Sequence, residues 1–291
     1  MTCSIIIVNY NGLAHTREAI TSVVQHSQES ETIVVDNCSS DGSVEALRTE
    51  FPQIKLVASE TNRGFGSGCN LGALQARGEY LFFLNNDALL SEDTPAVLRN
   101  IMKSHPRCGA CGPRVVNPDG SYQLSFGRHP SLSSERNARR LQRLPKHRRD
   151  QLAVFYERQF ANKPVDWISG AALMVRRDAF LKIGGFDESY FMYFEDADLC
   201  KRIRDIGMEV IYFPKTTLIH KGGESYPAKN PKIRLEYRRS QLRIYDKSRS
   251  LLTCLLIRCY IFVKFFPGLM TASERQLSLS VMGLLLKDQG R

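Results

Sequence analysis

Residues 3–12, 32–37 and 80–87 read CSIIIVNYNG, TIVVDN and YLFFLNND. Each stretch is dominated by β-branched, leucine or aromatic residues and ends in polar ones. Strands that are apolar at nearly every position lie inside a sheet whose two faces are both covered by helices. The three stretches therefore predict strands of a mostly parallel sheet in an α/β protein.

Helices are predicted between these strands. Apolar residues recur at helical spacing over residues 13–26, 43–51 and 67–77, and a further extended run covers residues 54–58. In sheets of this kind, ligands bind beyond the carboxyl ends of the strands. A binding site is therefore expected at the polar segments after the strands, which are Asn9-Tyr10-Asn11, Asp36-Asn37 and Asn85-Asn86-Asp87.

Composition limits the class of protein. The chain has 291 residues, 43% hydrophobic and 24% charged, which excludes a short peptide scaffold and a globally disordered protein. Its formal charge of +10 favours a polyanionic partner, such as nucleic acid, anionic lipid or a phosphorylated small molecule. The N-terminal residues lack the pattern of a signal peptide, so we expect the eight cysteines to be reduced thiols of a cytoplasmic protein.

The character of the chain changes twice. Residues 117–164 are polar, with a basic cluster between Arg136 and Arg149, which indicates an insertion or a mobile flap. A strand is expected in WISGAALMVRR, residues 167–177. From residue 228 the sequence is helical in character, basic first and apolar later. We therefore expect a main domain over residues 1–227 and a helical extension over residues 228–291.

Two interpretations of the extension stay open. If residues 239–264 formed one helix, its basic side chains would share a stripe of about 120°. That stripe would contain Arg239, Arg243, Lys247, Arg258 and Lys264. Such a helix would lie on an anionic membrane surface, whereas the alternative is a helix packed on the main domain. A membrane-spanning helix is not expected, because Arg258 and Lys264 interrupt the apolar stretch.

Two loops are candidates for nucleotide recognition. Asp36 ends the second strand, where a carboxylate can accept hydrogen bonds from a base or ribose, although a structural turn is an alternative. Asn62 and Arg63 precede Gly64 after the third strand, where glycine permits close backbone approach and arginine can bond a base. Asn70, in the next helix, can contact the same ligand. The glycine spacing does not match G-x-G-x-x-G, which disfavours a nicotinamide enzyme.

Acidic residues suggest a metal and a base. Asp87 follows an apolar strand, and one carboxylate can hold Mg²⁺ or Mn²⁺ together with diphosphate oxygens and water. His220, after a later strand, is a candidate further ligand. Glu195, Asp196 and Asp198 follow an aromatic run that can exclude water and raise carboxylate basicity. Helix capping is the alternative role for Glu195 and Asp198.

Seven ordered motifs carry a resemblance to a known family. They read IIIVNYNG, VDNCSSDGS, NRGFGSGCN, FLNND, WISGAALMVRR, GGFDESYFMYFEDADLCKR and IHKGGES. In this order they resemble family 2 glycosyltransferases with the GT-A fold, most closely the rhamnosyltransferase-like branch, over roughly residues 3–225. The resemblance implies an inverting transfer of a sugar from a nucleoside diphosphate sugar to an acceptor hydroxyl.

The resemblance also implies roles for individual residues. Asp196 would be the catalytic base, and Asp87 and His220 would hold the divalent cation, Mg²⁺ or Mn²⁺. The expected contacts to the donor are Asn9, Asp36, Asn62, Arg63, Asn70, Asn85 and Asn86. One departure from the family pattern is Asn85, which replaces the first acid of D-x-D and so removes one negative charge from the metal site.

The substrates follow from the resemblance only in outline. It suggests dTDP-rhamnose as donor, with a UDP-sugar as the alternative, and a glycan or lipid-linked glycan as acceptor, with residues 117–164 on the acceptor side. The expected location is cytoplasmic, either free or peripheral on the membrane. A noncatalytic nucleotide-sugar or polyanion-binding protein of the same fold is the competing hypothesis. Nucleic acid is disfavoured as a partner, because no aromatic-rich run accompanies the basic cluster.

Overall fold

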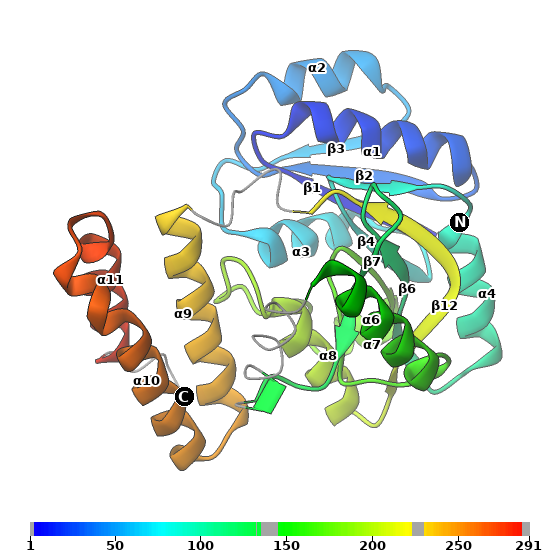
Figure 1. The fold of residues 1–291 in the computed structure, drawn as a ribbon. Helices are drawn as coiled ribbons and strands as arrows, with labels where there is room; N and C mark the ends of the chain where they lie inside the picture. Colours follow the sequence, from blue (N-terminus) through cyan, green and yellow to red (C-terminus); the bar gives the residue numbers. More distant parts are fainter. Residues whose placement is uncertain (1–2, 132, 135–144, 223–229, 287–291) are drawn as a thin grey trace.

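A mixed β-sheet forms the centre of the molecule. The structure is a computed structural model and describes residues 3–131, 133–134, 145–222 and 230–286. Its strands are β1 (Cys3–Asn9), β2 (Glu31–Asp36), β3 (Lys55–Ala58), β4 (Tyr80–Asn85), β5 (Ala88–Leu90), β6 (Cys108–Val116), β7 (Tyr122–Gln123), β8 (Phe126–Gly127), β9 (Lys163–Pro164), β10 (Trp167–Ile168), β11 (Ala172–Arg176) and β12 (Glu209–His220). The strand order is β3-β2-β1-β4-β11-β6-β12-β5, with β7 beside β6 and β9 beside β12 (Figure 1).

Helices cover both faces of this sheet (Figure 1). They are α1 (Leu13–His26), α2 (Ser43–Glu50), α3 (Phe65–Gln75), α4 (Thr94–Ser104), α6 (Lys146–Phe160), α7 (Arg177–Lys182) and α8 (Glu195–Asp205). The chain continues into α9 (Pro231–Ser248), α10 (Leu251–Phe265), the short 3₁₀ helix η1 (Phe266–Met270) and α11 (Ala272–Leu285).

The pairing of the strands confirms the predicted fold class. β1 pairs in parallel with β2 and β4, and β2 pairs in parallel with β3. Four strands run against this direction: β11 is antiparallel to β4 and β6, β5 and β9 are antiparallel to β12, and β7 is antiparallel to β6. The sheet is therefore mostly parallel, as expected, with antiparallel members in its second half.

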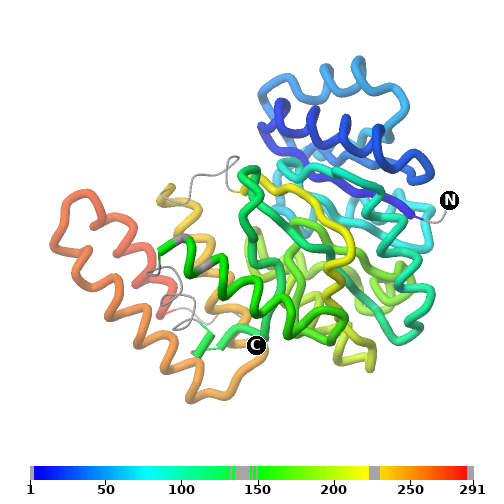
Figure 2. The backbone as a smooth tube through the Cα atoms, turned by 45° about the vertical axis from the view of Figure 1, so that its right-hand side comes forward, coloured from blue at the N-terminus to red at the C-terminus, as the bar shows by residue number. Residues whose placement is uncertain are grey.

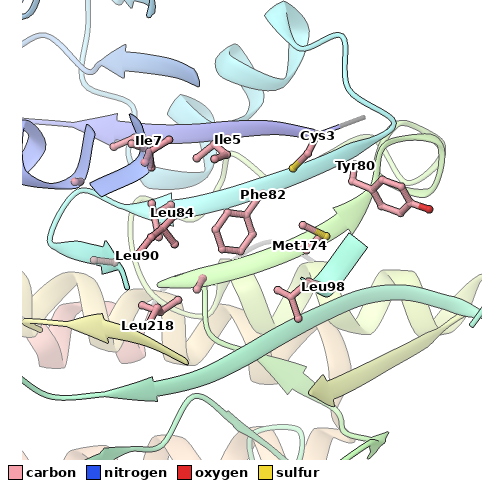
Figure 3. Packing of buried hydrophobic residues seen from close by; sticks show 14 of the residues in the cluster. Cys3, Ile5, Ile7, Tyr80, Phe82, Leu84, Leu90, Leu98, Met174 and Leu218 are labelled. Carbon is pink, nitrogen blue, oxygen red and sulfur yellow. The ribbon is translucent and has the colours of Figure 1, made fainter. Parts of the chain in front are cut away.

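Both faces of the central strands are buried, which explains their unbroken apolar runs. Ile5, Ile7 and Phe82 pack with residues of α1, α2 and α4, as the close view in Figure 3 shows for the strands. Ile6 and Phe83 point the opposite way and pack with α3, α7 and α8. Because successive side chains of a strand alternate between faces, each strand needs apolar residues at odd and even positions alike.

Glycines bring α3 close to its neighbours. A Cβ atom on Gly72 would lie 2.5 Å from the Ile6 side chain, so the helix approaches β1 more closely than alanine would allow. Gly64 has φ +97°, and a Cβ there would lie 2.1 Å from the carbonyl oxygen of Phe191. The glycines of this loop therefore serve close packing against the protein itself, in addition to any approach of a ligand.

Two sequence predictions are modified in the second half of the chain. The strand expected over residues 167–177 is two strands, β10 and β11, separated by a turn in which the Ala172 amide donates to the Ser169 carbonyl at 3.3 Å. The expected insertion over residues 117–164 carries β7, β8, α6 and β9. Arg136, Arg139, Arg140 and Arg143 of the basic cluster lie outside the described residues, and so do the side chains of Lys146 and Arg149.

The basic stripe predicted over residues 239–264 is wrong. The chain breaks at Arg249 and Ser250, so α9 and α10 are separate helices, and α10 folds back along α9 (Figure 1). The Ser250 hydroxyl accepts from the Thr253 amide and so caps the new helix. Arg249 itself donates to the carbonyl oxygen of Pro130 at 2.7 Å. A stripe requires one continuous helical phase, which the break destroys.

The C-terminal helices form a third apolar cluster beside the sheet, drawn in orange to red in Figure 2. Leu242 of α9, Ile257 and Ile261 of α10 and Val281 of α11 are its buried centre. Tyr190 from the loop before α8 joins the cluster, so the extension packs on the rest of the protein. The predicted boundary at residues 227 and 228 falls among residues 223–229, outside the described part.

One segment of the extension has the length and composition of a membrane-spanning helix. Among the described residues, Leu251–Met270 alone is long and apolar enough, by length and composition, to cross a membrane. The expectation that Arg258 and Lys264 exclude such a helix was therefore too strict. In the structure, Arg258 donates to the carboxylate of Asp246 in α9 at 2.7 Å, and this ion pair neutralises the charge of Arg258.

Candidate active site

The polar strand ends meet at one edge of the sheet, as predicted. In the parallel register, Asn9 lies opposite Asp36 and Val8 opposite Asn85. The Asn9 side-chain amide donates to the Asp36 carboxylate at 2.7 Å, and the Ser39 amide donates to its other oxygen at 2.8 Å. Asn9 is fully buried and Asp36 is 1% exposed. These two residues therefore hold strand ends and loop together beneath the surface of the edge.

A pocket of about 780 Å³ opens at this edge. Its polar lining includes residues from strand ends and loops far apart in the sequence, among them Asn37, Asn62, Asn85, Asn86, Asp87, Glu195, Asp196 and His220. Aromatic residues form another part of its wall: Phe65, Trp167, Phe191, Tyr193, Phe194 and Tyr237. Tyr237 belongs to α9, so the extension contributes to the pocket.

Two residues that were expected to contact the sugar donor, Arg63 and Asn70, bond to other residues of the protein instead. Arg63 forms an ion pair with Glu188 at 2.8 Å. The Asn70 side chain donates to the Phe186 carbonyl at 2.9 Å and accepts from the Phe186 amide at 2.8 Å. In the described part of the chain, neither residue lines the pocket, and the same holds for Asn9 and Asp36. Asn70 therefore links α3 to the loop before α8 through these two hydrogen bonds.

Asn37 belongs to a polar segment where a binding site was expected, but it was not among the expected donor contacts, and it lines the pocket. Its side-chain amide donates to the Asn62 side-chain oxygen at 2.9 Å and to the Gly64 carbonyl at 3.0 Å. It thereby joins the end of β2 to the loop before α3. The signal was present in the sequence, because a residue next to Asp36 must point in another direction from Asp36 itself.

Asp87 and His220 come together through strand pairing. Ala88 and His220 are partners in the antiparallel pair of β5 and β12, and the Lys221 amide donates to the Asp87 carbonyl at 3.0 Å. The Asp87 carboxylate consequently lies 3.1 Å from His220 Nε2. Burial acts to raise the pKa of Asp87, but the hydrogen bond and charge of His220 outweigh it, so this pKa lies below its usual value.

Gln123 orients the imidazole ring and was not predicted. Its side-chain oxygen lies 2.7 Å from His220 Nδ1, so with this amide orientation Nδ1 carries the proton and donates. Nε2 points toward the Asp87 carboxylate, and its lone pair would face that carboxylate once a bound cation displaced the Nε2 proton. The Asn85 side-chain amide lies 3.3 Å from the same nitrogen. A lone pair and a carboxylate that converge on one point are a fitting donor set for a cation.

These residues fit a metal ion only in part. No group of three or more His, Cys, Asp and Glu side chains is arranged to hold a metal within the described residues. Mg²⁺ and Mn²⁺ commonly use one or two protein ligands and complete their shell with substrate phosphates and water. The pair of Asp87 and His220 therefore suits an ion that arrives with a diphosphate.

Asp196 lies in the first turn of α8, directly after a strained loop. Tyr193 and Phe194 both have positive φ angles, 71° and 67°, which non-glycine residues rarely adopt. The loop is supported by α9, since the Ser240 hydroxyl donates to the Met192 carbonyl at 2.7 Å. Asp196 accepts from the Gly170 amide at 2.9 Å, and burial raises the pKa of its carboxyl.

The three acids of this segment have different environments. Burial and the neighbouring Asp196 charge raise the pKa of Glu195 to about 8, and its Oε2 has no hydrogen-bond partner among the described residues. Glu195 is therefore protonated at neutral pH. Asp198 is buried in ion pairs with Arg202 at 2.7 Å and Lys247 at 2.6 Å, and the second pair joins α8 to α9. Glu195 and Asp196 both line the pocket, and Asp196 is the one of the two whose carboxylate accepts the Gly170 amide there.

Comparisons with known proteins identify the family of this chain. The model of glycosyl transferase family 2 matches residues 4–184, and a model described as the N-terminal domain of galactosyltransferase matches residues 151–222. The chain is 29% identical over 231 residues to the N-acetylglucosaminyl-diphospho-decaprenol L-rhamnosyltransferase of Mycobacterium tuberculosis, covering 74% of this chain and 75% of that protein. It is 41% identical over 61 residues to rhamnosyltransferase WbbL of Escherichia coli, covering 21% of this chain and 23% of that protein.

Solved structures support the fold. The mannosyltransferase of Pyrobaculum calidifontis, in complex with GDP-Man and Mn²⁺, superposes with a TM-score of 0.60 at 14% identity, covering 98% of this chain and 86% of that one. Identity this low supports only the GT-A architecture. The family model, in contrast, covers more than half of the chain. The chain therefore belongs to glycosyl transferase family 2, is similar to its rhamnosyltransferases, and is a nucleotide-sugar-dependent glycosyltransferase.

Proposed function

We propose that this glycosyltransferase moves rhamnose from dTDP-rhamnose to a hydroxyl of a glycan or lipid-linked glycan, with inversion at the anomeric carbon. The names of the relatives from Mycobacterium tuberculosis and Escherichia coli support rhamnose, and the first also supports a lipid-linked acceptor. The observation that carries the proposal is one pocket lined by both a desolvated carboxylate, Asp196, and the pair of Asp87 and His220.

Asp196 is the general base in this proposal. An acceptor hydroxyl is a poor nucleophile until its proton is removed, and a base with a pKa raised toward neutrality removes it more effectively. Burial provides that increase at Asp196, while the protonated Glu195 beside it adds no second negative charge at neutral pH. Inversion needs a single displacement, so one base on the acceptor side is sufficient and no covalent enzyme intermediate forms.

The opposite end of the pocket would hold the departing nucleoside diphosphate. Asp87 and His220 would bind a divalent cation, which supplies positive charge to the diphosphate when bound. Gln123 keeps the His220 ring in the orientation that directs Nε2 toward Asp87. Asn37 and Asn62 form the amide surface on which the nucleoside would rest, and Asp36 supports that surface from beneath.

The proposal includes the acceptor side and the location. Residues 117–164 supply part of the pocket wall through Phe126, Arg128 and Tyr156, and we assign this wall to the acceptor. We place the reaction in the cytoplasm, where thiols stay reduced. All eight cysteines are free in the described residues, and six of them are buried.

Asp196→Asn tests the assignment of the base. We expect the turnover with dTDP-rhamnose to fall by roughly 10²–10⁴-fold, with donor affinity within a few-fold of wild type, because the base acts in the transition state and does not bind the nucleotide. Release of dTDP measures turnover, and calorimetry measures donor binding. The matched control is Asp205→Asn, an exposed acid on the same helix whose turnover should equal that of wild type.

The same assay tests the substrates and the competing hypothesis. Wild-type protein is presented with dTDP-rhamnose, UDP-sugars and GDP-mannose, each with a lipid-linked glycan acceptor. Turnover with a UDP-sugar and none with dTDP-rhamnose would refute the donor. Binding of a donor without turnover for any donor and acceptor pair would favour a noncatalytic binding protein. Wild-type turnover in Asp196→Asn would refute the base.

A further inference from the structure

Helix α10 is apolar around most of its circumference, interrupted by Arg258 and Lys264, yet only one side is covered by protein. Cys254, Ile257, Ile261 and Phe265 are buried against α9 and α11. A helix that is hydrophobic all round normally lies inside a protein or a membrane. We therefore expect the uncovered side of α10 to contact another molecule or a membrane surface.

The uncovered side presents a continuous apolar surface, which we call the α10 face. It consists of Leu252, Leu255, Leu256, Phe262, Val263 and Phe266, each at least 47% exposed, with Val263 at 70%. At about 100° per residue, these side chains lie within an arc of about 120°, opposite the buried one. Large apolar side chains gathered on one exposed face mark an interaction site rather than ordinary surface.

The charges around the α10 face are positive. The sequence contains no Asp or Glu between Asp246 and Glu274, whereas Lys264 and Arg275 are exposed there. Residues 228–291 hold thirteen Lys and Arg against four Asp and Glu, so this segment carries +9 of the formal charge of +10. An anionic surface complements this distribution. A second copy of the chain, placed face to face, would bring the same positive charge against itself.

We propose that the α10 face docks on an anionic lipid bilayer, with the helix lying in the plane of the surface and its apolar side chains inserted below the headgroups. Helices with one strongly apolar face and basic flanks bind membranes in this way. The opposite side of α10 is already packed on α9 and α11, and the ion pair of Arg258 with Asp246 lies on that side. The packed side therefore disfavours a spanning orientation, even though the segment is long enough to cross.

Docking would also place the pocket near the membrane. Tyr237 lines the pocket from α9, and α10 packs on the same helix. The pocket wall is thus one helix away from the α10 face. The inference rests on the exposed surface and its charge, and it holds whatever the sugar and acceptor of the enzyme are.

Flotation of the full chain with vesicles tests the proposal. The vesicles contain phosphatidylcholine with or without phosphatidylglycerol, at low salt and at high salt. The test variant combines Leu255→Glu with Val263→Glu, and the matched control combines Leu74→Glu with Leu181→Glu, two exposed leucines on α3 and α7. All four sites are exposed, so the substitutions should leave the fold intact, which circular dichroism and donor binding check.

The expected result is at least tenfold less of the test variant bound to anionic vesicles, with the control variant bound like wild type. High salt should weaken wild-type binding without abolishing it, because insertion of apolar side chains is not screened. Equal flotation of the test variant and wild type would overturn the proposal. The proposal would also be overturned if the wild type formed a dimer in solution and Leu255→Glu with Val263→Glu dissociated it. That result would assign the α10 face to a second copy of the chain. Resistance of bound protein to alkaline carbonate would overturn the in-plane orientation.

Discussion

Replacing Glu195 by Gln should change the pH dependence of stability. The pKa of this carboxyl is about 8 in the folded protein against 4.5 as its reference value, because of burial and the neighbouring Asp196 charge. Below about pH 4.5 the group is protonated in both the folded and the unfolded chain. As the pH rises to about 8, the unfolded chain releases its proton and the folded chain retains it, so the free energy of unfolding falls.

The size of the effect follows from the two pKa values. At pH 7 the gap between 4.5 and 7 lowers the stability of the wild type by on the order of 3 kcal/mol, whereas at pH 5 the loss is less than about 1 kcal/mol. The amide that Glu195→Gln introduces does not titrate, so the substitution removes this loss. Any constant cost of the new amide group is the same at each pH. The free energy of unfolding of the variant, relative to that of the wild type, should therefore increase by about 2 kcal/mol from pH 5 to pH 7.

Urea unfolding at pH 5, 6, 7 and 8 measures this difference. The control is Asp205→Asn on the same helix, whose exposed carboxylate pairs with Lys201 at 2.6 Å, and its difference from wild type should stay nearly constant over this range. In an Asp196→Asn background, the benefit of Glu195→Gln should shrink, because the charge that raises the pKa of Glu195 is gone. A stability difference between Glu195→Gln and wild type that does not grow with pH would show that Glu195 is ionised in the folded protein.

Three further predictions concern the metal site, the loop before α3 and the contact of the extension. Gln123→Leu removes the acceptor of the His220 Nδ1 proton, and the Mn²⁺ concentration needed for half-maximal donor binding in calorimetry should rise about 10–100-fold; an unchanged requirement would exclude the positioning role. Gly64→Ala should lower the free energy of unfolding by about 2 kcal/mol or more, because its Cβ meets the Phe191 carbonyl, whereas Gly42→Ala, at φ +79° in open space, should cost only about 1 kcal/mol; equal losses would contradict the packing argument. Lys247→Met leaves the buried Asp198 with Arg202 alone and should cost about 1–3 kcal/mol in thermal unfolding, and no loss would mean that the contact of α9 with α8 does not depend on this ion pair.

Local patterns in the sequence determined the first half of the fold and the location of the site. Runs such as residues 4–8, apolar at most odd and even positions, require a strand covered on both faces, and helical spacing between such runs requires crossover helices. Parallel strands bring their carboxyl ends to one edge. The polar residues at these ends were therefore predicted to meet, and Asn9, Asp36 and Asn85 do.

The orientation of each side chain at that edge depended on tertiary contacts. Asp36 and Asn37 are adjacent in the sequence, yet one bonds to Asn9 beneath the surface and the other lines the pocket. Gln123 reaches His220 only because β7 adds to β6 at the edge where β12 ends. No spacing in the sequence reports such a contact between residues 97 positions apart.

The extension shows the same division. The sequence alone determined that residues 228–291 are basic first and apolar later, because composition does not depend on contacts. Only the tertiary structure decided that the chain turns at Arg249, that Arg258 faces Asp246 and that one side of α10 stays uncovered. The physical reason is that periodicity fixes which residues share a helix face within one helical segment, whereas pairing between distant segments decides which of those faces is buried.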